Sequence, residues 1–272
     1  MIIYSRFSAY QYGFSQIKSA LVNNLVDRVK WDLKKVSRKS RSVLSNLEGS
    51  QKHKKAVILC NGPSLLHTDF SLLENTFTFG LNRINLMFEQ NHFRPDIILA
   101  FDSLLNMQNI EFFREDRSIL KILTYKSYSD IKISRDDLIY SYHTAVPKAF
   151  CCYPSDGFID RGNTTFKALQ LAFSMGFEQV ALVGADHNFA TDKPNEIILN
   201  DGDDKLHFHK DYHLTGTKSQ NPDKLMFDMN FRDARIVYEK NGRKIVNASQ
   251  GGFLEEFERM DLETFIKGSN DI

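Results

Sequence analysis

Short apolar runs separated by turn-forming residues recur along the chain from residue 56 onwards. Strands covered on both faces of a parallel sheet read as unbroken apolar runs of this kind. A helical pattern at residues 166–175, ended by Gly176, lies between two of the runs. The pattern therefore predicts an α/β fold with a mostly parallel sheet flanked by helices. The runs occupy residues 56–60, 77–80, 97–101, 119–124, 138–142, 180–183 and 244–247.

The first run ends in a turn made of Asn61, Gly62, Pro63 and Ser64. Glycine permits backbone angles that other residues avoid, and proline fixes φ. Ser64 is expected to cap a short helix that follows. A strand, a glycine turn and a helix start present free N–H groups at the carboxyl edge of a sheet, where open α/β folds bind phosphates. The alternative is a plain connection that binds no ligand.

Polar residues also follow other predicted strands. Asp102 comes directly after an apolar run, and Asn82 and Asp186 follow one within three residues. Because parallel strands end at one edge, these side chains are expected to line a common site. Singly, each could be a turn former or a helix cap. Thr164 and Thr165 begin the helix at 166–175, where hydroxyls and free N–H groups can hold an anion or simply cap the helix.

The stretch at 190–222 is polar and is long for a simple connection between two elements. It is therefore predicted to form a lid. His207, His209 and His213 lie in this stretch, and His187 precedes it. Histidine serves as a general base or as a metal ligand near neutral pH. Their spacing fits no common metal motif, so the sequence leaves a metal ligand set unknown.

The first 50 residues are predicted to form a basic helical extension, followed by one domain over 55–265. Residues 1–55 carry 12 Lys/Arg against 3 Asp/Glu, whereas the rest carries 23 against 31. An apolar stripe recurs at helical spacing at Val22, Val26, Val29, Leu33 and Val36. Such a helix either lies on an anionic membrane surface or packs on the core or on a second subunit.

Composition narrows the class of protein. A net charge of +1 over 272 residues gives no global attraction to nucleic acid. Cys60, Cys151 and Cys152 suit neither a metal site nor a structural disulfide, which favours a reduced, cytoplasmic protein. No clean signal peptide or membrane-spanning run is evident, so any membrane contact is expected to be peripheral, at the inner face.

Three blocks of sequence resemble a known family. They are ILCNGPSL at 58–65, FRPD at 93–96 with Asp102, and GNT at 162–164 leading to LVGADH at 182–187. Together they resemble the 6-hydroxymethylpterin pyrophosphokinase-like family, including its bacterial motility accessory factor and surface-polysaccharide branch. The first and last blocks are also similar to bacterial CMP-dependent sialyltransferases. The resemblance covers roughly residues 55–262 and implies a Rossmann-like sheet that holds a nucleotide.

The resemblance also implies roles for individual residues. In the sialyltransferases a lid histidine is the general base, for which His207 and His209 are the nearest equivalents here, with Asp186 beside the donor. Asp102 replaces an asparagine of the sialyltransferases, and a carboxylate there suggests Mg²⁺ or a ribose hydroxyl. The residues expected to contact the nucleotide or its phosphate are Asn61, Gly62, Pro63, Ser64, Asn82, Asp102, Asn163, Thr164, Thr165 and Tyr212.

The leading hypothesis is a glycosyltransferase of lipopolysaccharide or capsule synthesis. It would use a CMP-activated acidic sugar of the sialic acid, nonulosonate or Kdo type, need no cofactor, and act on a glycan or lipid-linked acceptor. The first alternative is Mg²⁺-dependent diphosphate transfer from ATP to a pterin-like alcohol. The second is a non-catalytic nucleotide-binding scaffold. The sequence does not identify the donor sugar, the acceptor or the oligomeric state, and a homo-oligomer stays open.

Overall fold

A computed structural model describes residues 26, 28–142, 149–189 and 193–268. Within them, eight strands form one sheet in the order β10-β9-β6-β1-β2-β3-β4-β5, and every neighbouring pair is parallel. The predicted Rossmann-like α/β architecture is confirmed. The strands are β1 Lys55–Leu59, β2 Phe77–Leu81, β3 Ile97–Ala100, β4 Leu120–Thr124, β5 Leu138–Ser141, β6 Gln179–Val183, β9 Lys244–Asn247 and β10 Glu258–Arg259.

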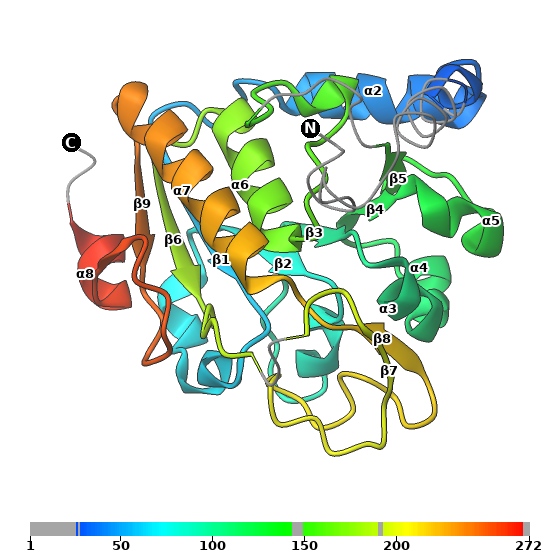
Figure 1. Cartoon of the computed structure of the whole chain (residues 1–272). Helices are drawn as coiled ribbons and strands as arrows, with labels where there is room; N and C mark the ends of the chain where they lie inside the picture. Colours follow the sequence, from blue (N-terminus) through cyan, green and yellow to red (C-terminus); the bar gives the residue numbers. More distant parts are fainter. Residues whose placement is uncertain (1–25, 27, 143–148, 190–192, 269–272) are drawn as a thin grey trace, which may run out of the picture.

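Helices and short turns cover both faces of the sheet, so the strands are buried on both sides. In Figure 1, α6 (Thr164–Met175) and α7 (Lys224–Lys240) lie side by side across one face. The opposite face packs against α3, α8 and short 3₁₀ turns. The shorter elements are η1 Pro63–His67, η2 Phe70–Leu73, η3 Ile84–Met87, α3 Ser103–Gln108, α4 Ile110–Glu115, η4 Tyr125–Ser127, α5 Tyr128–Ile131, η5 Pro154–Asp156 and α8 Leu262–Lys267.

The strand order creates a topological switch point between β1 and β6. From β1 the chain builds β2 to β5 on one side, and then returns to place β6 on the other side of β1. Open α/β sheets bind ligands beside the carboxyl ends of the strands at such a point. The predicted lid adds a separate antiparallel pair, β7 Ile197–Leu199 and β8 Lys218–Gln220, which lies below those carboxyl ends in Figure 1.

The described part of the N-terminal segment packs on the sheet edge. Helix α2 (Lys35–Leu47) contacts β5, and Ser40 Oγ accepts a hydrogen bond from the backbone N–H of Tyr140. The turns after α2 also dock, because the N–H of Gly49 donates to the carbonyl of Ser174 at the end of α6. The stretch between α2 and β1 is therefore held against the end of α6.

The predicted apolar stripe does not form one packed face. Val22 lies outside the described residues, and Val29 and Leu33 are exposed, whereas Val36 is buried. A turn at residues 33–34 interrupts the helix, so residues on either side of it no longer share a face. Trp31 is buried instead and stacks against Tyr142. No helix among the described residues is both long and apolar enough to cross a bilayer.

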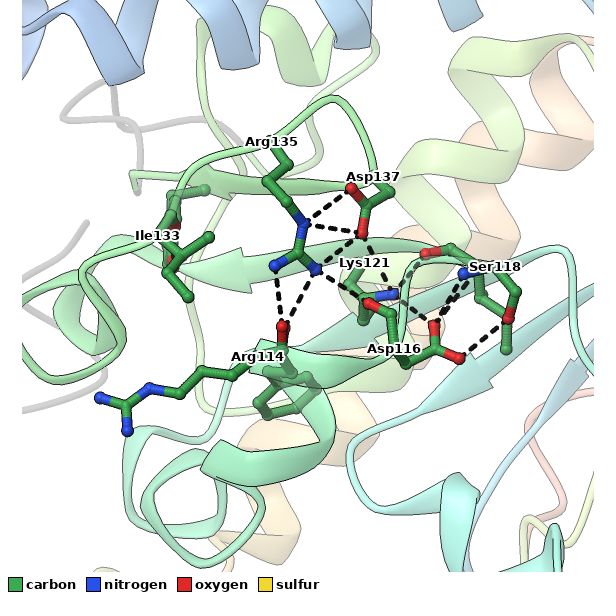
Figure 2. Close-up of polar contacts among 10 residues, drawn as sticks. Arg114, Asp116, Ser118, Lys121, Ile133, Arg135 and Asp137 are labelled. Carbon is green, nitrogen blue, oxygen red and sulfur yellow. Dashed lines mark hydrogen bonds and ion pairs between the residues drawn. The ribbon is translucent and has the colours of Figure 1, made fainter.

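A polar network fixes the amino ends of β4 and β5 (Figure 2). The fully buried Lys121 places Nζ 2.6 Å from Asp116 Oδ1 and 3.6 Å from Asp137 Oδ2. Arg135 pairs with Asp137 at 2.8 Å and donates to the carbonyl of Asp116. Because buried charges need partners, both carboxylates are part of the fold rather than free groups. This network lies at the sheet edge opposite the switch point.

Candidate functional site

The turn after β1 is packed directly on the end of β6. The N–H of Gly62 donates to the carbonyl of Gly184 at 2.9 Å. The N–H of Ser64 donates to Asp186 Oδ2 at 2.9 Å, and the Ser64 hydroxyl donates to Asp186 Oδ1. The prediction that Ser64 caps a helix is therefore wrong, since its side chain bonds a carboxylate from a distant strand. Asp186 thus joins the two strands that flank the switch point.

A Cβ atom at residue 62 would have no room. It would lie 2.6 Å from Asp186 Oδ2 and 2.7 Å from the carbonyl oxygen of Gly184. Gly184 itself has a φ of +66°, and its own Cβ would meet the carbonyl oxygen of Cys60 at 2.7 Å. Both glycines are needed because two backbones approach each other closely here. Glycine therefore brings the polar ends of β1 and β6 together.

Asn82, at the end of β2, is the meeting point of three segments. Its backbone is left-handed, with a φ of +48°, which asparagine tolerates better than most residues. The Thr164 hydroxyl, at the start of α6, donates to Asn82 Oδ1 at 3.3 Å. Burial raises the pKa of the Tyr212 hydroxyl, a hydrogen bond with the Asn82 side chain opposes that shift, and the nearby Asp102 carboxylate adds to it. Strand, helix and lid thus share one polar contact.

The lid segment, which we define as residues 193–222, is seated on this edge. The N–H of Phe208 donates to the carbonyl of Asn61 at 2.9 Å. The buried Arg83 guanidinium donates to the carbonyls of Asp211 and Tyr212, each at 2.7 Å. Phe208 and Tyr212 are buried in the same apolar cluster as the β1 side chains that face them. The lid therefore covers the carboxyl ends of β1 and β2.

Two buried amide groups here lack partners within the described residues. Asn61 Oδ1 and Asn163 Nδ2 are inaccessible and make no hydrogen bond. The other side-chain atom of Asn163, Oδ1, accepts from the N–H of Phe166 and so caps α6. Buried polar groups are nearly always paired, and an exception calls for an explanation such as a ligand. We call Asn61, Ser64, Asn82, Thr164, Asp186 and Tyr212 the carboxyl-edge site.

The remaining predicted residues are placed less centrally. Asp102 Oδ1 accepts from the N–H groups of Leu104 and Leu105, so it caps α3. Thr165 lies 3.6 Å from the Cys60 thiol, whose pKa burial raises to about 12. Pro63 opens the 3₁₀ turn η1. His209 is turned into its own loop, where Nδ1 accepts from the N–H of Asp211.

Neither Arg83 nor Asp204 was identified from the sequence as a residue that holds the lid. Both Nδ1 atoms of His207 and His213 face the Asp204 carboxylate, at 2.9 and 2.7 Å from Oδ2. His207 also stacks on Tyr212, with ring centroids 3.9 Å apart and an angle of 4°. His207 is therefore the lid histidine that stacks face to face on a residue of the carboxyl-edge site, whereas His213 meets the same Tyr212 ring edge-on at 5.2 Å. A dense acid and histidine pattern in residues 201–213 was the only signal for this cluster.

Two hollows of the described structure lie away from this site. A depression of about 730 Å³ lies at the amino ends of the first strands, lined by Lys55, Phe77 and Asp96 among others. A hollow of about 10 Å³, the space of one water, lies among Phe101, Ser141 and Lys167 beyond the carboxyl ends of β3 to β5. The lid segment is seated on the carboxyl-edge site, which explains why no open hollow is found there. We favour this site over the hollows because of its polar side chains.

The fold and the linked strand ends define a Rossmann-like α/β protein with a polar site at its switch point. The chain belongs to the MptE-like family, described as 6-hydroxymethylpterin diphosphokinase MptE-like, whose model matches residues 29–192. The resemblance to the 6-hydroxymethylpterin pyrophosphokinase-like family is thereby confirmed. The match ends before the lid, so it says nothing of Asp204, His207 or Tyr212.

A solved structure shares the fold. The chain is similar to the "MAf glycosyltransferase from Magnetospirillum magneticum AMB-1", with a TM-score of 0.50 and 14% sequence identity. The similarity covers 83% of this chain and 38% of that chain, so this chain spans well under half of that protein. At this identity the likeness shows the fold alone. No curated protein sequence matches the chain significantly.

Proposed function

We propose that the chain is a glycosyltransferase that uses a CMP-activated acidic sugar in the synthesis of a bacterial cell-surface polysaccharide. The observation that carries the proposal is the contact of Asn82 with both Thr164 and Tyr212, because it joins a strand end, a helix start and the lid at one polar point. The fold shared with a protein titled a glycosyltransferase supports the same class of reaction. The donor would be a sialic acid, nonulosonate or Kdo type of sugar.

The proposed roles follow from position. The turn from Asn61 to Ser64 would lie against the phosphate and ribose of the donor. Its contact would be the unpartnered Asn61 Oδ1, which can accept from a ribose hydroxyl, because the N–H groups of Gly62 and Ser64 already donate to Gly184 and Asp186. Thr164 and Tyr212 would hydrogen-bond the departing phosphate, where negative charge develops. Because the lid segment is seated on this edge, the donor could enter only after that segment moves.

The reaction would be a direct displacement. The acceptor hydroxyl oxygen forms a bond to the anomeric carbon, while the bond from that carbon to the phosphate oxygen breaks and CMP leaves with the electron pair. The acceptor proton passes to Nε2 of His207, because Asp204 holds the Nδ1–H of this ring. Asp204 would thereby act as a positioning residue. The acceptor would be a glycan or a lipid-linked sugar at the inner face of the membrane.

The test is turnover of CMP-sugars by the purified full-length chain, followed as CMP release and as transfer to an oligosaccharide acceptor. We expect His207→Ala to lower the rate by at least about 100-fold, the usual contribution of a general base. His92→Ala is the control, because His92 is an exposed residue far from the carboxyl edge in sequence and fold. Unchanged turnover in His207→Ala would remove this residue from the mechanism. No turnover of any CMP-sugar by the wild type would refute the proposal.

The family description favours a second candidate, diphosphate transfer from ATP to a pterin-like alcohol. That reaction would need Mg²⁺, with Asp102 and Asp186 as the carboxylate ligands. Both carboxylates already accept hydrogen bonds, Asp102 from α3 and Asp186 from Ser64, so an ion would have to displace these contacts. Thermal stabilisation by ATP with Mg²⁺, and none by CMP, would favour this candidate. Stabilisation by neither nucleotide would favour a non-catalytic scaffold.

A further inference from the structure

Three side chains in the lid converge on one point. His207 and His213 direct their Nδ1 atoms at the carboxylate of Asp204, and the three candidate ligand atoms lie within 4.8 Å of one another. The two imidazole rings are 5.0 Å apart and nearly perpendicular. Within the described residues this is the one group of three or more His, Cys, Asp or Glu side chains so arranged. Two imidazoles and a carboxylate form a common ligand set for divalent transition metals.

The surrounding backbone orients these side chains. Asp204 Oδ1 accepts from the N–H of Leu206 at 2.9 Å, which fixes the carboxylate so that Oδ2 faces both rings. The N–H of Asp204 donates to the carbonyl of Lys210, which closes a loop that carries His207 and ends three residues before His213. The His207 ring is held by its stacking on the buried Tyr212. Hydrogen bonds and packing behind the ligands are what makes a metal site selective and tight.

The cluster is also accessible to an ion. The side chains of Asp204, His213 and His207 retain 10%, 17% and 27% of their exposure. They are therefore shielded from bulk solvent without being sealed in the core. Ligand atoms 2.7–2.9 Å apart need to separate by about half an ångström to surround an ion with bonds of about 2.0–2.1 Å. A surface loop can make that adjustment more readily than a packed strand can.

We propose that Asp204, His207 and His213 form a binding site for a divalent transition metal ion of the Zn²⁺ type in the lid. Three protein ligands leave a fourth position for water. Metal binding requires the Nε2–H tautomer of each ring. Nδ1 gives its proton to solvent and binds the ion through its lone pair, while Nε2 takes up a proton from solvent. Each neutral ring thus changes tautomer without net proton release. Two imidazole ligands disfavour Mg²⁺, which prefers oxygen ligands.

The site gives the lid a metal-dependent conformation. The ion would tie residue 204 to residue 213 across a loop that carries Tyr212 to Asn82 and Phe208 to Asn61. A consequence that rests on the proposed function concerns His207. With Nδ1 on the ion, Nε2 carries the proton and cannot accept another, so the bound metal would inhibit transfer. The metal site itself does not depend on that function.

The test is direct metal binding by the metal-free full-length chain. We expect one equivalent of Zn²⁺ to bind in calorimetry, and Co²⁺ in its place to give visible absorption bands typical of nitrogen and oxygen ligands. Asp204→Asn and His213→Gln should each weaken Zn²⁺ binding by at least about 100-fold, since loss of a mere supporting group already costs 10–100-fold. His209→Gln is the matched control, because His209 lies in the same loop with its ring turned away from the cluster.

Two results would overturn the proposal. One is wild-type chain that binds neither Zn²⁺ nor Co²⁺, and the other is equal loss of binding in His209→Gln and His213→Gln. Circular dichroism melts without metal check that each variant is folded. Addition of Zn²⁺ should raise the melting temperature of the wild type and of His209→Gln but not that of Asp204→Asn. These readouts need no turnover, so failure of the glycosyltransferase proposal would leave them unaffected.

Discussion

Replacing Gly62 by alanine tests whether the turn after β1 really depends on its contact with β6. The backbone of Gly62 has a φ of −69°, which alanine adopts freely, so any cost is steric. The added Cβ would meet Asp186 Oδ2 at 2.6 Å and the carbonyl oxygen of Gly184 at 2.7 Å. Overpacking of this kind costs about 1–3 kcal/mol. At about 3 °C per kcal/mol for a domain of this size, Tm should fall by roughly 3–9 °C.

The same substitution also separates a stability effect from a binding effect. Moving the turn away from β6 pulls the Ser64 N–H off Asp186, so Gly62→Ala should lose the thermal stabilisation by CMP that the proposed function predicts for the wild type. Gly80→Ala is the matched control, because its Cβ would meet Ile84 Cγ2 at 2.6 Å and Pro95 Cγ at 2.9 Å, away from Asp186. The control should lose a similar Tm and keep the CMP response. A Gly62→Ala variant with the Tm and the CMP response of the wild type would refute this reasoning.

Two further predictions concern acid stability and the lid. Burial opposes ionisation of Asp116 and Asp137, but hydrogen bonds from Lys121 and Arg135 outweigh it and hold both pKa values below the usual range. Their stabilisation is thus complete above the unfolded value of about 3.9 and is lost as the pH falls through the folded values. In Asp137→Asn the midpoint of urea unfolding should decrease less steeply than in the wild type as the pH is lowered below 5. The same pH profile in both proteins would contradict this. Arg83→Met removes two hydrogen bonds to the lid and should speed limited proteolysis of residues 193–222 about tenfold, whereas Arg94→Met, whose arginine bonds carbonyls of its own loop, should not.

The sheet could be predicted from sequence because each buried parallel strand is an apolar run. The run at 244–247 matches β9 residue for residue, and the others deviate by one residue or so at an end. The weak elements were missed for the opposite reason. Strand β7 is exposed along its length and β10 has two residues, so neither carries a burial pattern. The apolar stripe that ends at Val36 failed because a turn breaks the helix, and local periodicity cannot report such a break when the residues on both sides favour helix.

The site shows the same division between local and distant information. That Asn61, Asn82 and Asp186 share an edge followed from strand direction alone, which is a property of the whole sheet. The individual hydrogen bonds between these residues could not be predicted from strand direction. Ser64 could satisfy a helix start or a carboxylate, and both are compatible with its neighbours in sequence.

Only the switch point decides between those two contacts for Ser64. It places β6 beside β1 and so brings Asp186, 122 residues away, within reach of the Ser64 hydroxyl. The lid obeys the same logic, since Arg83 and Tyr212 meet across 129 residues through a contact that neither segment encodes by itself. Residues that belong to no local pattern, yet bond across the switch point, are therefore the ones whose replacement should separate function from folding.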